Sequence, residues 1–211
     1  MLKINFLGDS ITEGCGSSHK DKCFVSVVEK TLLCIARNYG IGGTRIALNK
    51  SRSRNPIIDL YFGDRVKDMN HDADYVFVFG GTNDYGHGDA PFGEFGDTKP
   101  DTFFGAMDYL VQNLLKFYKI DQLIFILPLY RENETSPYGD GSKKEPGRTL
   151  PEYREAMLKV LNKYNINVLD IKEIIGRGEN NPFLIDGLHP NDKGHHLIAS
   201  LICDYINQKT S

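Results

Sequence analysis

Short apolar runs alternate with amphipathic segments along almost the whole chain, and this alternation limits the fold more than any other feature. The apolar runs cover residues 3–7, 33–38, 75–79, 122–127 and 167–169. Strands that alternate with helices typically form a parallel sheet with helices on both faces. The sequence therefore predicts an α/β protein with five parallel strands.

Apolar periodicity also places the predicted helices. Apolar residues recur at helical spacing around residues 24–32, 103–115, 153–164 and 197–206. A weaker pattern at residues 56–67 is interrupted by Gly63. No internal repeat or linker divides the 211 residues, of which 40% are hydrophobic. A chain of this size buries a sizeable core, so we expect a single domain spanning residues 1–211.

Charge and hydropathy argue against two kinds of partner. The 25 Lys and Arg residues against 28 Asp and Glu give a formal charge of −3, and no five like charges are consecutive. Nucleic-acid binding is therefore not expected. The longest apolar stretches, residues 75–79 and 123–127, are far shorter than the roughly 20 residues of a membrane span. Asp9 ends the first apolar run before a secretory segment can form, so cytoplasmic residence is expected.

The four cysteines do not form a metal-binding or redox motif. They lie at positions 15, 23, 34 and 203, and no CxxC pair is present. Cys15, His19 and Cys23 have regular spacing, but three scattered ligands without a fourth are a poor metal site. We expect free thiols, no metal and no cofactor, and leave the reactivity of Cys15 open.

Polar, glycine-bearing segments follow four of the predicted strands. They are residues 8–14, 38–44, 80–84 and, past the fifth apolar run, 186–191. In open α/β sheets, ligands bind beyond the carboxyl ends of the strands. Each segment alone is a weak signal, but all four together predict a functional site at this edge.

These segments resemble the four sequence blocks of the SGNH hydrolases, also called the GDSL esterase/lipase family. The matching residues are GDS at 8–10, Gly43, GTND at 81–84 and DGLHP at 186–190, and they occur in the family's order over the whole chain. The resemblance implies a flavodoxin-like, three-layer α/β/α sandwich with strand order 2-1-3-4-5. In that order Ser10 and Asn83 face each other after neighbouring strands.

Three of these residues suit nucleophilic catalysis. A serine hydroxyl needs a base to remove its proton, and a neutral histidine is suited to this near pH 7. His189 is the candidate base for Ser10. Asp186, three residues before the histidine, can accept the other imidazole N–H and stabilise the imidazolium. We therefore expect Ser10, His189 and Asp186 to form the catalytic set.

Ester attack also creates an oxyanion, which fixed hydrogen-bond donors stabilise. The predicted donors are the Ser10 N–H, the Gly43 N–H and the Asn83 side-chain amide. Glycine at position 43 lets the backbone approach the reacting carbonyl and adopt a positive φ. The chain lacks GxSxG around Ser10, so the nucleophile elbow of the α/β-hydrolase fold is not expected.

Taken singly, the motifs allow simpler interpretations. Residues 9–10 can cap a helix, and residues 186–189 can form a turn that leads into the last helix. His195 and His196, in the first turns of that helix, are expected to be surface or cap groups. The conjunction of four blocks favours the catalytic interpretation over these alternatives.

The substrate depends on two unusually long connections, residues 85–100 and 130–149. The first carries Tyr85, Phe92 and Phe95 among acidic residues, which favours a small-molecule ester with a short acyl or acetyl group, including O-acetylated carbohydrate. For the second, an ordinary surface loop is an equal alternative.

Four residues are predicted to contact the substrate, and two other functions remain open. The contacts are Asp9, Asp84, Tyr85 and Tyr130. A lysophospholipase or thioesterase acting on longer acyl chains is one alternative function. A non-catalytic, flavodoxin-like protein that binds a small ligand is the other. The sequence leaves the oligomeric state open.

Overall fold

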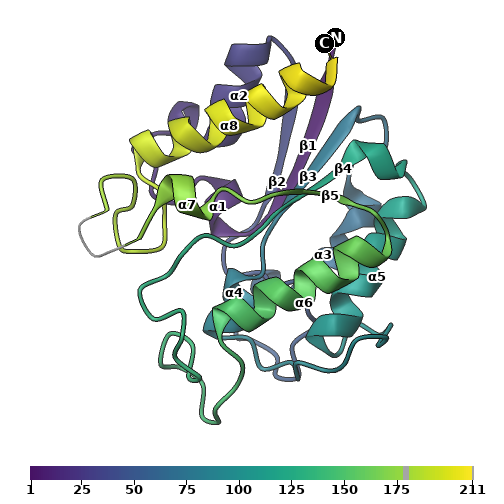
Figure 1. The fold of residues 1–211 in the computed structure, drawn as a ribbon, viewed down its shortest axis with the longest axis vertical. Helices are drawn as coiled ribbons and strands as arrows, with labels where there is room; N and C mark the ends of the chain where they lie inside the picture. Colours follow the sequence, from purple (N-terminus) through teal and green to yellow (C-terminus); the bar gives the residue numbers. More distant parts are fainter. Residues whose placement is uncertain (178–180, 211) are drawn as a thin grey trace.

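The computed structural model describes residues 1–177 and 181–210 and contains one five-stranded parallel sheet (Figure 1). Its strands lie in the order β2-β1-β3-β4-β5. They are β1 (Lys3–Gly8), β2 (Ile35–Gly40), β3 (Tyr75–Phe79), β4 (Leu123–Ile126) and β5 (Asn167–Leu169). The predicted fold class and strand order are confirmed.

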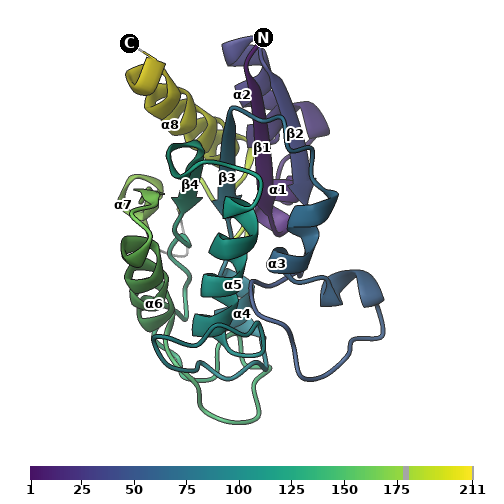
Figure 2. The ribbon, with the colours of Figure 1, turned by 90° about the vertical axis from the view of Figure 1, so that its right-hand side faces the viewer.

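Helices cover both faces of the sheet (Figures 1 and 2). Helices α2 (Phe24–Leu32) and α8 (Asp192–Thr210) pack together on one face, and α5 (Phe103–Leu115) and α6 (Leu150–Lys163) on the other. Each face has its own buried apolar cluster. Shorter elements are α1 (Ser10–Glu13), η1 (Lys20–Lys22), η2 (Pro56–Asp59), α3 (Phe62–Arg65), η3 (Val66–Asp68), α4 (Thr82–Gly86), η4 (Ile120–Gln122) and α7 (Lys172–Ile175).

Central and edge strands differ in how well the sequence predicted them. Strand β3 matches its predicted range, because a strand buried on both faces is apolar throughout. Strand β2 begins two residues later than predicted. Leu33 ends α2 in a left-handed conformation (φ 49°) and is exposed, so the strand starts at Ile35. The polar residues up to Gly40 then complete this edge strand.

The weak helical pattern at residues 56–67 corresponds to three short pieces, η2, α3 and η3. Gly63, which weakened the prediction, lies inside α3. A Cβ atom there would lie 2.6 Å from the Tyr109 ring of α5. The glycine therefore permits a close approach between α3 and α5, and it does not end the helix.

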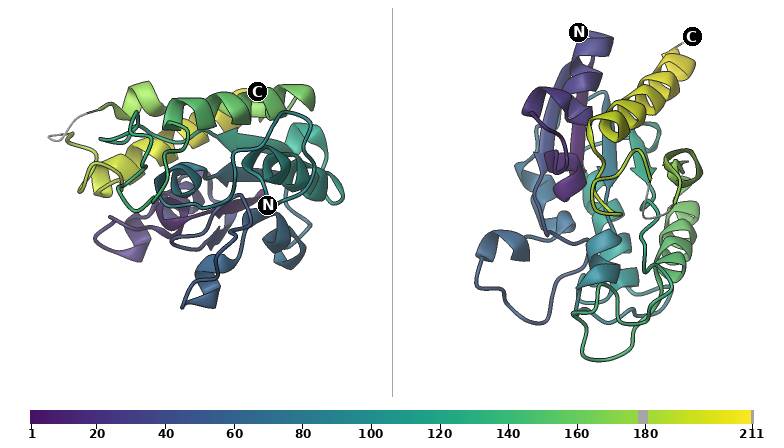
Figure 3. Two further views of the ribbon diagram at one scale, coloured as in Figure 1. Left: turned by 90° about the horizontal axis from the view of Figure 1, so that it is seen from below. Right: turned by 90° about the vertical axis from the view of Figure 1, so that its left-hand side faces the viewer.

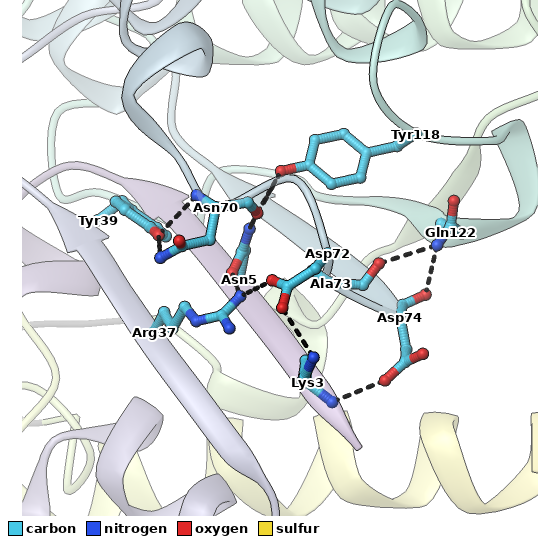
Figure 4. Close-up of polar contacts among 10 residues, drawn as sticks. All are labelled: Lys3, Asn5, Arg37, Tyr39, Asn70, Asp72, Ala73, Asp74, Tyr118 and Gln122. Carbon is cyan, nitrogen blue, oxygen red and sulfur yellow. Dashed lines mark hydrogen bonds and ion pairs between the residues drawn. The ribbon is translucent and has the colours of Figure 1, made fainter. Parts of the chain in front are cut away.

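Side chains close the amino end of the sheet (Figure 4). Asp72 forms ion pairs with Lys3 at 2.7 Å and with Arg37 at 2.6 Å. The buried Asn5 amide donates to the Asn70 carbonyl (2.7 Å) and to the Tyr118 hydroxyl (3.1 Å). This end thus satisfies its polar groups with its own residues.

The carboxyl end of the sheet carries α1, α4 and the long connections (Figure 3). Residues 87–100 and 130–149 run beyond the strand ends on this side without long regular elements of their own. Among the described residues, no helix has the length and apolar character needed to cross a membrane. The predicted functional segments therefore share one edge with both long loops.

Candidate active site

Ser10 lies in the turn that follows β1. Asp9 is the N-cap of α1, and its Oδ1 accepts a hydrogen bond from the Ile11 N–H at 3.0 Å. Ser10 is the first residue of this short helix and is partly exposed. The capping interpretation therefore holds for Asp9 and leaves the Ser10 hydroxyl available.

His189 and Asp186 lie in the connection that leads into α8. The Asp186 Oδ1 accepts hydrogen bonds from the backbone N–H groups of Leu188 (3.0 Å) and His189 (2.7 Å). Its Oδ2 lies 2.7 Å from the His189 Nδ1. Burial opposes ionisation of Asp186, but hydrogen bonds from His189 and Leu188 outweigh it and hold the pKa of Asp186 below its ordinary value. An ionised carboxylate thus fixes the orientation of the imidazole.

The Ser10 Oγ lies 3.0 Å from the His189 Nε2, although the two residues are 179 positions apart. Because the ionised Asp186 can only accept, the His189 Nδ1 carries a proton and the neutral ring presents Nε2 as an acceptor. The Ser10 hydroxyl therefore donates to His189. A hydroxyl, an imidazole and a carboxylate form one hydrogen-bonded line.

Asn83 and the glycine turn after β2 lie beside this line. Asn83, in α4, donates its side-chain amide to the Thr44 carbonyl at 3.0 Å. Gly43 has φ 75°, a left-handed conformation that favours glycine. A Cβ atom on Gly42 would lie 3.7 Å from the Ser10 Cβ, so this turn packs directly against Ser10. The structure thus brings all four predicted blocks together.

Arg65 is a further polar residue beneath this site, and the sequence analysis missed it. It is buried, and its guanidinium donates to the Gly8 carbonyl at 3.1 Å, to the Thr44 Oγ1 at 2.9 Å and to the Tyr39 carbonyl. Burial lowers the pKa of Arg65 to about 10. The side chain therefore ties the end of β1, the end of β2 and the Gly43 turn to one another.

All four predicted substrate contacts are buried, and Tyr130 is the most exposed of them at 7%. Asp9, Asp84 and Tyr85 have 1%, 3% and 1% of their surfaces exposed. Asp84 accepts the Ile46 N–H (3.0 Å) and the Ala47 N–H (2.8 Å), and the Tyr85 hydroxyl donates to loop carbonyls. These side chains are buried and bonded within the protein, which does not favour direct contact with a substrate, and their role as contacts stays a prediction. Asp84 instead supports the segment that follows Gly43.

Tyr130, the fourth predicted contact, has a different environment. Its hydroxyl donates to Glu173, and the Arg177 guanidinium lies 3.9 Å from its ring centroid. The residue lines a cavity of about 300 Å³ that also includes Gly187, next to the candidate acid. Tyr130 therefore remains available as a proposed contact near Asp186.

His195 also departs from expectation, because it is fully buried. Its Nδ1 accepts from the Phe24 N–H at 3.3 Å, so its Nε2 carries the proton and donates to the Cys15 carbonyl at 3.1 Å. Burial lowers the pKa of His195 and keeps the ring neutral. The ring joins α8, α2 and the segment after Ser10, which positions the His189 connection against α1.

The cysteines show no link to the candidate chemistry. Within the described ranges, no group of three or more His, Cys, Asp or Glu side chains is placed to hold a metal ion. Cys15 is a free, exposed thiol. Partial burial and the neighbouring Asp186 and Glu13 raise the pKa of Cys15, which disfavours its reactive thiolate form.

Comparison with solved structures supports the same fold. A protein from Lactobacillus plantarum is 25% identical, with a TM-score of 0.80 over 98% of this chain and 97% of that chain. A lipase/acylhydrolase from Enterococcus faecalis is 20% identical, with a TM-score of 0.68 over 99% and 97% of the two chains. A Bacteroides uniformis protein named as a GDSL-like lipase is 16% identical, with a TM-score of 0.71 over 99% and 96%.

Sequence comparison identifies the family directly. No curated protein matches this sequence significantly. The sequence model of the GDSL-like lipase/acylhydrolase family, however, matches residues 6–197, which include all four blocks around Ser10, Gly43, Asn83 and His189. The chain therefore belongs to the GDSL-like lipase/acylhydrolase family.

Proposed function

We propose that this protein is a serine esterase that hydrolyses carboxylic esters of short acyl groups, including acetyl esters, through an acyl-enzyme intermediate. The observation that carries the proposal is the hydrogen-bonded line from Ser10 Oγ to His189 Nε2 (3.0 Å) and from His189 Nδ1 to Asp186 (2.7 Å). The steps below require no metal or cofactor.

In the first half-reaction, His189 Nε2 takes the proton of the Ser10 hydroxyl as Oγ attacks the ester carbonyl carbon. Asp186 stabilises the imidazolium that forms. The carbonyl oxygen becomes an oxyanion, which the Ser10 N–H, the Gly43 N–H and the Asn83 amide stabilise. The bond to the alcohol oxygen then breaks, and His189 gives its proton to the departing alcohol.

In the second half-reaction, water replaces the alcohol. His189 takes a proton from the water as its oxygen attacks the acyl carbon of the acyl-enzyme. The same donors stabilise the second oxyanion. The bond to Ser10 Oγ breaks, the carboxylic acid leaves, and His189 returns the proton to Ser10. The products are one alcohol and one acid for each water consumed.

The structure changes the argument for a carbohydrate substrate. Tyr85 is buried, and Phe92 packs against Phe103, Phe104 and Tyr153, so these rings do not form the exposed aromatic platform that the sequence predicted for a sugar. Phe95 remains, with 56% of its surface exposed. We therefore retain short acyl esters as the proposed substrate class and do not argue for carbohydrate from these rings.

The test is hydrolysis of p-nitrophenyl acetate by the wild type, Ser10→Ala and His189→Ala. Each variant should lower kcat by roughly four orders of magnitude or more, because a missing nucleophile or base leaves only binding and oxyanion stabilisation. Ser200→Ala, at an exposed serine of α8, is the matched control and should retain the wild-type rate. Wild-type rates in both Ser10→Ala and His189→Ala would refute the proposal.

A further inference from the structure

A large cavity at the carboxyl end of the sheet is not used by the proposed mechanism. Its volume is about 830 Å³, and residues 87–92, residues 142–148 and the pair 50–51 form its walls, with Tyr153 beside them. An acetyl group needs far less space than this. The cavity is therefore suited to the larger part of an ester, which for a short acyl group is the alcohol.

The cavity wall is rich in positive charge. Cationic side chains come from Lys50, Lys143, Lys144 and Arg148, against the two acids Asp89 and Glu145. Asp89, whose carboxylate accepts the backbone N–H groups of Lys50 (2.8 Å) and Ser51 (2.9 Å), and Glu145 offset part of this charge, and Arg148 forms an ion pair with Glu152 at 3.0 Å. The four cations still exceed these three acids by one charge, and this excess attracts an anion.

Lys143 is the key cation of this wall. It is half-buried, and its ammonium donates to the Asp84 carbonyl at 3.1 Å. The Tyr153 and Tyr85 ring centroids lie 5.4 and 5.9 Å from its Nζ. Among residues 1–177 and 181–210, no carboxylate oxygen lies within 4.0 Å of this nitrogen. An ammonium has three donors, so Lys143 keeps donor capacity for a ligand.

Short connections join this cavity to the candidate oxyanion donors. Lys143 contacts the carbonyl of Asp84, the residue after Asn83. The His87 N–H donates to the Asn83 carbonyl at 3.0 Å, one turn along α4. His87, the C-cap of α4, lines the cavity, so its wall lies one helical turn, about 5 Å, along α4 from Asn83.

We propose that this cavity binds an anionic group, carboxylate or phosphate, on the alcohol part of the ester, with Lys143 as its main partner. The inference rests on the proposed function for the reaction itself. It adds the substrate class: short acyl esters of alcohols that carry a negative charge. Lys143 determines the preference for esters with an anionic alcohol part, and it takes no part in bond breaking.

The test compares three acetate esters: propyl acetate, which is neutral, 3-acetoxypropanoate and 3-acetoxypropyl phosphate. The wild type should prefer at least one anionic ester over propyl acetate by about tenfold in kcat/KM, since a charge-assisted hydrogen bond contributes this much. The better anionic ester tells whether carboxylate or phosphate is the preferred group. Lys143→Met should reduce the preference to near one, and Lys143→Arg should restore part of it.

Lys159→Met is the matched control, because it removes one positive charge from an exposed position of α6 outside the cavity wall. Its preference should equal that of the wild type. A wild-type preference near one, or a preference that Lys143→Met leaves intact, would overturn the anion site while leaving the esterase proposal standing.

A binding measurement separates the two proposals further. Calorimetric titration of the Ser10→Ala protein with inorganic phosphate needs no turnover. Binding that weakens about tenfold in Ser10→Ala/Lys143→Met supports the anion site, even if none of the three esters is hydrolysed. Equal phosphate affinity in both proteins, or no binding in either, contradicts it.

Discussion

The two ends of the sheet use the same residue types in opposite ways. At the amino end, Arg37 pairs with Asp72 at 2.6 Å (Figure 4). At the carboxyl end, Arg65 is buried and donates to backbone carbonyls and a threonine hydroxyl, and no described carboxylate oxygen lies within 4.0 Å of its guanidinium. One arginine thus completes a surface ion pair, and the other holds loops in place.

The carboxyl groups show the same contrast. Hydrogen bonds from Arg37 and Lys3 hold the pKa of Asp72 well below its ordinary value. Burial raises the pKa of Asp9 to about 7, against the opposing hydrogen bond from the Ile11 N–H. Asp9 Oδ2 is buried without a hydrogen-bond partner among the described atoms. The surroundings of Asp72 at the amino end favour its charged form, and those of Asp9 at the carboxyl end favour its neutral form.

This difference indicates a division of labour between the two ends. A network that satisfies its own polar groups has no capacity left for a ligand, so it contributes only to stability. Buried acids with raised pKa values and buried polar atoms without partners cost stability, and they cluster where a protein binds or transforms a substrate. The comparison can be tested with matched substitutions of the same residue type at each end.

The largest expected difference is between Asn83→Ala and Asn5→Ala. Asn83→Ala removes a proposed oxyanion donor and should lower kcat about 100- to 1000-fold. Asn5→Ala removes buried hydrogen bonds to Asn70 and Tyr118 and should lower the free energy of unfolding by about 1–3 kcal/mol. The Asn5 variant should keep kcat within about twofold of the wild type. Hydrolysis of p-nitrophenyl acetate and urea unfolding measure the two effects.

A similar loss of kcat in both variants would contradict the division of labour. It would mean that the site depends on the rigidity of the whole sheet and not on a local donor. Unfolding free energies measured on the same preparations show whether each protein is folded under assay conditions, so that loss of structure is not counted as loss of rate.

The fold was largely predictable because the central strands carry an unambiguous pattern. Strands such as β3 are apolar on both faces, and helices such as α5 carry a regular apolar stripe. The start of β2 was misplaced because Leu33 is apolar but exposed, at the end of a helix. Hydropathy alone does not separate an exposed apolar residue from the first residue of an edge strand.

The site was predictable where residues lie in continuous blocks, as Ser10 and His189 do. Arg65 and His195 were missed because their partners are backbone groups in segments distant from them in the sequence. No local spacing marks such a residue. The burial of Asp84 and Tyr85 was not predicted for a related reason: adjacency to Asn83 in the sequence does not decide which way a side chain points.

The second comparison is between Arg65→Met and Arg37→Met. Methionine at position 65 leaves the buried carbonyls of Gly8 and Tyr39 without these donors, at a cost of about 3 kcal/mol in unfolding free energy. We also expect kcat to fall about tenfold, because the Ser10 and Gly43 segments are no longer fixed together. Arg37→Met breaks a partly exposed ion pair and should cost less stability and no activity.

Thermal unfolding and p-nitrophenyl acetate hydrolysis distinguish the outcomes for the arginine pair. Equal losses of unfolding free energy in the two variants would show that Arg65 contributes to stability in the same way as Arg37. A stability loss in Arg65→Met without any change in kcat would restrict its role to folding. The two measurements therefore separate the effect of Arg65 on the position of the Ser10 and Gly43 segments from its effect on the stability of the fold.

The third comparison concerns pH and is between Asp9→Asn and Asp72→Asn. The folded-state pKa of Asp9, about 7, lies above the unfolded value near 4, so the folded protein binds more protons between these pH values. Wild-type stability should therefore fall from pH 4 to pH 7 through this group. Asparagine at position 9 removes the fall, so the variant should gain stability relative to the wild type at pH 8 compared with pH 4, by at most about 4 kcal/mol for a pKa difference of about three units.

Asp72→Asn should change the pH profile in the opposite direction. The folded-state pKa of Asp72 is depressed, so its contribution to stability is present above the unfolded pKa and disappears as the pH falls. The variant should lose stability relative to the wild type at pH 8, and the loss should be smaller, but not absent, at pH 3. Urea unfolding at these pH values measures both profiles. Shifts of the same sign in the two variants would mean that the acids at the two ends of the sheet are held in the same protonation state, which the geometry around Asp9 and Asp72 does not allow.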